Sequence, residues 1–61
     1  QTSHPDYLAC YYQLGKMYEA VGENEKAVDA FLDGRRLAKK NGDIKAVGEL
    51  SEALMMHDIF D

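Results

Sequence analysis

Hydrophobic and polar positions follow a helical period along most of the chain, beginning with a stretch from about residue 6 to residue 21. Its apolar series is Leu8, Tyr11, Leu14 with Gly15, Tyr18 and Val21. These positions recur every three or four residues, which is the spacing of one face of an α-helix. Because Gly15 has no Cβ, a second backbone can come close to this face. The pattern therefore predicts a helix that packs against another helix.

Two further periodic stretches predict helices over residues 24–41 and 43–57. The apolar face of the second is Ala27, Val28, Phe31, Gly34, Leu37 and Ala38, and that of the third is Ile44, Val47, Leu50 with Ser51, and Leu54. Asn24 and Asp43 are expected to cap the N-termini of these two helices, and Gly22 and Gly42 are expected to end the helices that precede them. A linker of about three residues makes the first two helices antiparallel. The expected fold is all-α: a helical hairpin with a third helix against its open side.

Composition limits the chain to one domain over residues 1–61, and a chain of this length buries only about 60% of its unfolded surface. Its net charge of -4 argues against a general nucleic-acid surface. Its apolar runs are far shorter than the roughly 20 residues that span a bilayer, and its first residues lack the features of a signal peptide. A single cysteine, Cys10, cannot form an internal disulfide. This favours a reducing compartment, and we expect the cytoplasm.

The spacing of the first two helices resembles the tetratricopeptide repeat, whose roughly 34-residue unit reads W-x₂-L-G-x₂-Y, then A-x₃-F, then P. The matching residues are Tyr11, Leu14, Gly15, Tyr18, Ala27, Phe31 and Gly34. Tyr11 keeps a large aromatic side chain where the family often has tryptophan. Lys39 departs from the pattern, because it stands where the family has its closing proline. The resemblance covers about residues 6–41, and residues from about 43 to 58 are similar to a C-terminal capping helix.

The resemblance implies roles for two sets of residues in the first helix and its partner. The seven matching residues would form the packing scaffold. In this family the first helix of each unit lines a concave groove that receives a peptide or a partner helix. The corresponding positions here are Ala9, Tyr12, Gln13, Lys16, Glu19 and Ala20. Tyr12 and Lys16 could provide an aromatic contact and a charge-assisted bond to a peptide carboxylate, or both could be merely exposed.

Three functional interpretations follow from this resemblance. The leading one is a non-catalytic protein-protein interaction module that binds a peptide or a partner helix on the concave face. A stable array usually needs about three repeats. The second interpretation is therefore a scaffold that self-associates through its open N-terminal edge, unless more repeats precede it. The edge residues would be Tyr7, Leu8, Cys10 and Tyr11. The third interpretation is a docking segment of a larger enzyme.

No other group of residues predicts a site with equal strength. The basic residues Arg35, Arg36, Lys39, Lys40 and Lys45 could bind an acidic partner, but helix-end charge and pairing with Asp33 or Glu49 explain them more simply. His4, His57 and Cys10 lack the spacing of a metal site. The carboxylate pairs Asp29 with Asp33 and Glu49 with Glu52 have no accompanying base or nucleophile. We therefore expect no catalysis, no metal and no cofactor.

The last apolar residues of the chain have two possible roles. They could meet a partner or pack back onto the third helix, and they are Met55, Met56, Ile59 and Phe60.

Overall fold

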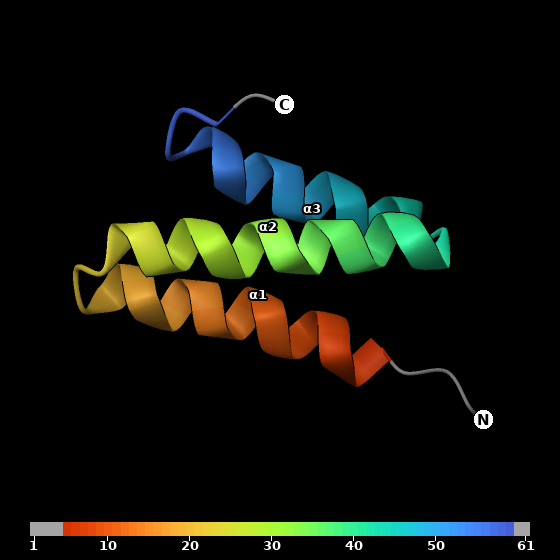
Figure 1. The fold of residues 1–61 in the computed structure, drawn as a ribbon, viewed down its shortest axis with the longest axis horizontal. Coiled ribbons are helices and arrows are strands. Elements are labelled where there is room, and N and C mark those ends of the chain that lie inside the picture. Colours follow the sequence, from red (N-terminus) through yellow and green to blue (C-terminus); the bar gives the residue numbers. More distant parts are fainter. Residues whose placement is uncertain (1–4, 60–61) are drawn as a thin grey trace.

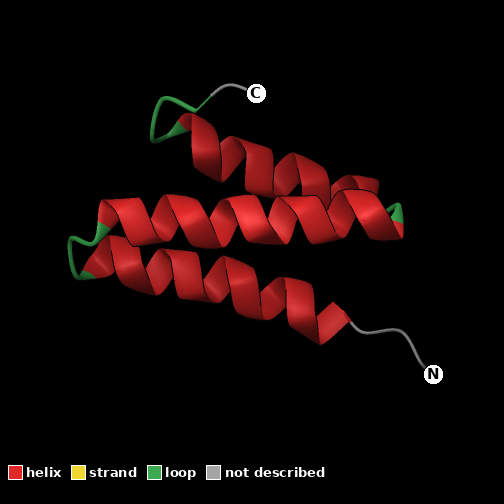
Figure 2. Cartoon of the chain, in the orientation of Figure 1, coloured by secondary structure: helices red, strands yellow, loops and turns green. Residues whose placement is uncertain are grey.

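The computed structural model describes residues 5–59, with side chains described from residue 8 onward. It contains three helices: α1 (Pro5–Ala20), α2 (Asn24–Asn41) and α3 (Ile44–Met55). Figure 2 shows only helices and short connections within this part of the chain, and no strand. The expected all-α fold is therefore confirmed.

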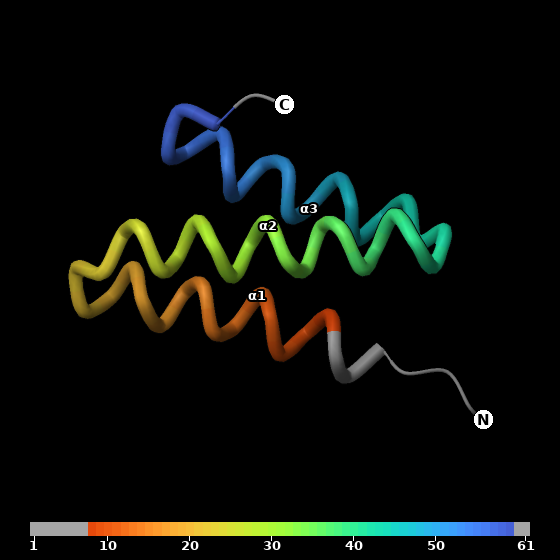
Figure 3. Tube along the Cα trace, in the orientation of Figure 1, coloured from red at the N-terminus to blue at the C-terminus, as the bar shows by residue number. Residues whose placement is uncertain are grey.

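The helices lie side by side, with α2 between α1 and α3 (Figure 1). The Cα trace measures 36 × 21 × 13 Å. Its shortest dimension is close to the diameter of one helix, about 10–12 Å. The trace in Figure 3 shows α1 and α2 running antiparallel, joined by a tight turn, as expected from the short linker. Helix α2 packs against both neighbours, whereas α1 and α3 make few backbone contacts with each other.

The turn between α1 and α2 depends on Gly22, which adopts a left-handed backbone with a φ of 84°. The Gly22 amide donates to the Glu19 carbonyl and the Glu23 amide donates to the Tyr18 carbonyl, at 3.1 and 2.8 Å. These bonds satisfy carbonyls that the end of α1 leaves open, as expected for a glycine just past a helix. The expectation for Asn24 is wrong. Asn24 is the first residue of α2, and the capping position belongs to Glu23, whose side chain makes no capping bond.

The turn between α2 and α3 matches the sequence prediction. Gly42 ends α2 in a left-handed conformation, and its amide donates to the Lys39 carbonyl at 3.1 Å. Asp43 then caps α3, because its Oδ1 accepts from the Ala46 amide at 3.1 Å.

Asp43→Ala is expected to lower the free energy of unfolding by about 1 kcal/mol, since the Ala46 amide would lose its only side-chain acceptor. Asn24→Ala is the matched control. It should change stability by no more than about 0.5 kcal/mol, because Asn24 caps nothing. Urea unfolding followed by circular dichroism measures both. Equal losses for the two variants would contradict the assignment of the caps.

Phe31 lies at the centre of the core and is completely buried. The buried apolar residues around it are Leu8, Ala27, Ala38, Leu50, Ala53 and Leu54. A Cβ added to Gly15 would lie 2.4 Å from the Phe31 ring, and one added to Gly34 would lie 2.8 Å from the Tyr11 Cβ. The two glycines therefore allow close packing, as the sequence predicted, although an aromatic ring rather than a backbone fills the space at Gly15.

Most expected packing positions on α2 and α3 are buried or half-buried, but three apolar residues expected on the packing faces are exposed. These are Leu14, Val21 and Ile44, of which Leu14 is 38% and Ile44 is 83% exposed. The expectation that Leu14 belongs to the packed scaffold is therefore wrong.

The expectation that Leu8 and Tyr11 lie at an open N-terminal edge is also wrong. Leu8 is buried in the core and Tyr11 is half-buried beside Gly34, so neither forms an open edge.

The helix α3 ends at Met55, two residues earlier than expected. The chain then turns, with the His57 and Ile59 amides both donating to the Leu54 carbonyl, at 2.8 and 3.0 Å. Ile59 packs back against the core, whereas Met55 and Met56 are exposed. Of the two expectations for this segment, a partner contact or packing back onto the third helix, the second applies to Ile59. Phe60 lies outside the described residues.

Candidate functional site

A groove lies on the face where α1 and α3 approach each other, and we call it the α1–α3 groove. It consists of two hollows with volumes of about 330 and 440 Å³, which share Tyr12 and Glu49. Helix α1 contributes Leu8, Ala9, Tyr12, Gln13, Lys16 and Glu19. The apolar residues from α3 and the turn after it are Ala46, Leu50, Ala53 and Met56. The charged residues on that side are Asp43, Lys45, Glu49 and Glu52.

Five of the six positions expected to line the binding face do line this groove: Ala9, Tyr12, Gln13, Lys16 and Glu19. They are brought together because their spacing of three and four residues puts them on one side of α1. The sixth groove position suggested by the resemblance, Ala20, is exposed and lines neither hollow.

Three stripes of α1 have different environments. One stripe, Leu8, Tyr11, Gly15 and Tyr18, is buried or half-buried against the core. The next carries the groove residues. The third stripe is Cys10, Leu14 and Met17, continued by Val21 one residue past the end of α1, and all four residues are exposed. We call this third stripe the outer stripe of α1.

Tyr12 connects the groove to the core. Its side chain is 37% exposed, and its ring centroid lies 5.9 Å from that of the buried Phe31, with the rings tilted by 52°. The Lys16 Nζ lies 6.0 Å from the Tyr12 ring centroid, within reach of a cation–π interaction. The aromatic ring is therefore held in place on one side and open to the groove on the other.

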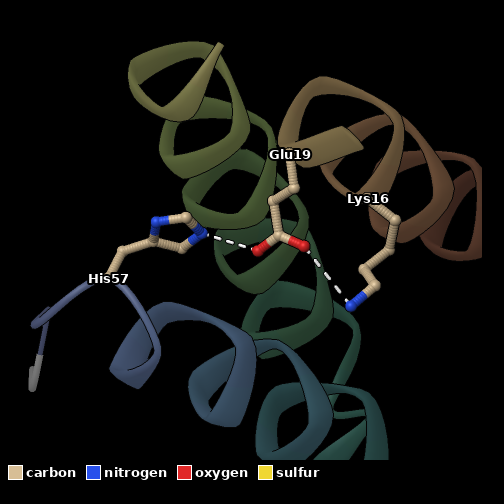
Figure 4. Close-up of polar contacts among 3 residues, drawn as sticks. All are labelled: Lys16, Glu19 and His57. Carbon is tan, nitrogen blue, oxygen red and sulfur yellow. Dashed lines mark hydrogen bonds and ion pairs between the residues drawn. The ribbon is translucent and has the colours of Figure 1, made fainter. Parts of the chain in front are cut away.

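Glu19 joins α1 to the turn that follows α3 (Figure 4). Its Oε2 lies 2.6 Å from the His57 Nε2, and its Oε1 lies 3.3 Å from the Lys16 Nζ. An ionised carboxylate can only accept hydrogen bonds, so the His57 Nε2 carries the proton in this contact. The His57 ring also lies 6.2 Å from the Phe31 ring. Because α1 and α3 have few backbone contacts, side-chain contacts such as this bridge join the two sides of the groove.

The hydrogen bond from His57 holds the pKa of Glu19 below its ordinary value of 4.5, with a further contribution from Lys16 and some opposition from burial. A carboxylate whose pKa is lower in the folded state stabilises the fold above its unfolded pKa. That contribution is lost as the pH falls through the folded pKa.

The wild-type melting temperature is therefore expected to fall more steeply than that of Glu19→Gln as the pH is lowered from neutral to below 4.5. Thermal unfolding at a series of pH values measures both slopes. Parallel curves for the two proteins would contradict a stabilising role for the Glu19 carboxylate.

The sequence did not predict the α3 side of the groove or the bridge from Glu19 to His57. The sequence offers Glu49 and Glu52 only as a carboxylate pair without a base or nucleophile, Glu49 also as a partner of a basic residue, and His57 only as a candidate metal ligand. The spacing of Glu49, Glu52 and Ala53 on one side of α3 was a usable signal for the groove. No local signal indicates the bridge, because its residues are 38 positions apart.

The basic residues do not form a second site with the groove. Arg36 pairs with Asp33 at 3.3 Å, as expected, and both side chains are more than half exposed. Of the five basic residues, Lys45 alone lines the groove, and it forms no ion pair within the described residues. Across residues 5–59, no three His, Cys, Asp or Glu side chains gather in a metal-binding arrangement. His4 lies outside this part of the chain.

The fold and the groove define the class of this protein as an all-α protein of three helices in the described region. No protein-family model, curated protein or solved structure matches the chain. None of the helices in the described region has both the length and the apolar character needed to cross a membrane.

Proposed function

We propose that this chain is a non-catalytic protein-protein interaction module that binds a peptide or a partner helix in the α1–α3 groove. The observation that supports this most strongly is that five of the six positions predicted for the binding face line one groove together with residues of α3. The proposal includes membership of the tetratricopeptide repeat family, with α3 as a capping helix. The close packing of Phe31 at Gly15 and of Tyr11 at Gly34 supports it, because these are positions of the repeat pattern.

The chemistry of the groove suits recognition rather than reaction. Its most buried residues, Leu8 and Leu50, are apolar, and together with Ala9 and Ala46 they give this part of the groove an apolar lining against which a partner's side chains can be buried. The surrounding charged groups are exposed or already hydrogen-bonded, and an open groove of this kind excludes little water. A partner would gain affinity from apolar contact and orientation from the charged rim.

Selection of a phage-displayed library of random peptides on the immobilised protein tests the proposal. The Tyr12→Ala, Lys16→Ala double variant should bind the selected peptides about tenfold more weakly, since it removes the central aromatic contact. A second variant, Ala9→Gln, fills part of the groove at an exposed position without changing its charge or disturbing the core.

The matched control is the double variant Met17→Ala, Val21→Ala, which truncates two exposed residues of the outer stripe, one on the same helix and one just past its end. It should bind the selected peptides as tightly as the wild type. If only this control loses binding, or if no selected peptide distinguishes the groove variants from the wild type, the groove is not the binding site.

A second candidate function is self-association through the outer stripe of α1, with a second copy of the chain as the partner. Successive residues of the stripe are separated by four, three and four positions. This is the spacing of an apolar seam between two packed helices. Leu14, Met17 and Val21 are 38%, 52% and 67% exposed, so the seam is uncovered in the single chain.

Sedimentation equilibrium tests this second candidate. If the stripe drives association, Met17→Lys should shift the protein to a monomer, while Ile44→Lys should not, because Ile44 is exposed on α3 away from the stripe. Leu8 is unsuitable for this experiment, since a charge there would enter the core. A wild-type protein that remains monomeric at high concentration excludes self-association.

A further inference from the structure

Some charged side chains of the α1–α3 groove have ion-pair or hydrogen-bond partners within the chain and others do not, and this difference limits what can bind there. On the α1 side, Lys16 is paired with Glu19, so neither presents a free charge. At the end of the groove, the Asp43 carboxylate accepts from the Ala46 amide and serves as the cap of α3. The groove charges that remain are those on α3.

Glu49 and Glu52 are both exposed and both line the hollow nearer to Glu19. Within the described residues neither carboxylate takes part in an ion pair. They are three positions apart on α3, which places them next to each other on one side of the helix. Lys45 lines the other hollow, the one that contains Leu8 and Leu50. Glu49 lines both hollows and lies between Lys45 and Glu52 in the sequence of α3. The hollow nearer to Glu19 is therefore acidic at its rim.

The aromatic and apolar surfaces lie directly beside these carboxylates. Tyr12 belongs to the same hollow and its side chain is 37% exposed, with the Lys16 Nζ 6.0 Å from its ring centroid. Leu8 and Leu50 form the apolar floor of the neighbouring hollow. A guanidinium or ammonium group is favourable both near carboxylates and over a tyrosine ring. An apolar side chain one helical turn away would then reach the floor.

We infer that the occupant of the α1–α3 groove is a segment of another protein with Arg or Lys and apolar side chains on one face. Its basic group lies between Glu49, Glu52 and Tyr12, and its apolar side chains lie on Leu8 and Leu50. This inference rests on the proposed function and adds the chemical class of the partner.

The same peptide library tests this inference when the analysis is restricted to peptides that Ala9→Gln weakens, because these peptides occupy the groove. They should be enriched in Arg and Lys next to apolar residues. The double variant Glu49→Gln, Glu52→Gln should weaken them about fivefold, and raising the salt concentration should weaken the wild-type complex. The matched control, Glu25→Gln with Asp29→Asn, makes the same change in net charge at exposed positions of α2 outside the groove. It should leave binding unchanged.

The other outcomes distinguish a failure of this inference alone from a failure of the proposed function. Groove-binding peptides that are acidic or uncharged would overturn the basic partner and leave the proposed function standing. If the selected peptides bind to Ala9→Gln and to the double variant Tyr12→Ala, Lys16→Ala as tightly as to the wild type, both this inference and the proposed function are overturned. Concentration-dependent association of the wild type that Glu49→Gln, Glu52→Gln abolishes would show that a second copy occupies the groove, and would overturn the separate partner.

Discussion

Phe31→Ala is expected to lower the free energy of unfolding by about 3–5 kcal/mol, the largest loss for any single truncation among residues 8–59. The Phe31 ring is completely buried, packs at Gly15 of α1, and lies near the rings of Tyr12 and His57. Its removal would leave a cavity at the point where all three helices contribute to the core. A chain of this size has a total stability on the order of 3–9 kcal/mol, so the variant should be largely unfolded at 25 °C.

Far-UV circular dichroism during urea unfolding measures this loss, and Met56→Ala provides the control. Met56 is 82% exposed, so its truncation should change stability by no more than about 0.5 kcal/mol. A loss below about 1 kcal/mol for Phe31→Ala would mean that Phe31 is not at the centre of the core.

Gly15→Ala and Gly48→Ala are expected to change stability in opposite directions, although both place an alanine inside a helix. Alanine gains about 1 kcal/mol over glycine in a helix, through the smaller loss of backbone entropy. At Gly48 nothing lies within 4 Å of the added Cβ, so the full gain should appear as stabilisation. At Gly15 the added Cβ would lie 2.4–2.8 Å from three carbons of the buried Phe31 ring. Overpacking of this kind costs about 1–3 kcal/mol and should exceed the gain.

A double-mutant cycle tests the cause of the Gly15 effect. If the clash with Phe31 is responsible, Phe31→Leu should remove much of the cost of Gly15→Ala, since the smaller side chain can move away. Chemical unfolding of the four proteins in the cycle gives the coupling energy. Additive losses, or a stabilised Gly15→Ala variant, would contradict the close packing of these two residues.

The sequence predicted α2 more accurately than α1, and the reason is the distribution of apolar residues. On α2 the apolar residues lie mainly toward its neighbours, so the helical period identified Ala27, Phe31, Gly34 and Ala38 as buried. On α1 apolar residues occur on every side, and the period alone cannot choose among three stripes. This is why Leu14 was placed in the scaffold, although it lies on the exposed outer stripe.

The candidate site was predicted in part. The α1 side of the groove followed from the resemblance and the helical period, which placed Ala9, Tyr12 and Lys16 together. The α3 side depends on how closely α3 approaches α1, which local patterns do not determine. The contact between Glu19 and His57 likewise depends on the turn after Met55 and on the packing of Ile59.

The proposed function requires that a partner binds in the α1–α3 groove and not on the outer stripe of α1. Amide chemical shifts of the ¹⁵N-labelled protein, recorded during titration with a peptide selected on the wild type, distinguish the two surfaces. Binding in the groove predicts the largest changes at Ala9, Tyr12 and Gln13 on α1 and at Glu49 and Ala53 on α3. The largest changes at Leu14, Met17 and Val21, with the groove amides unmoved, would contradict it.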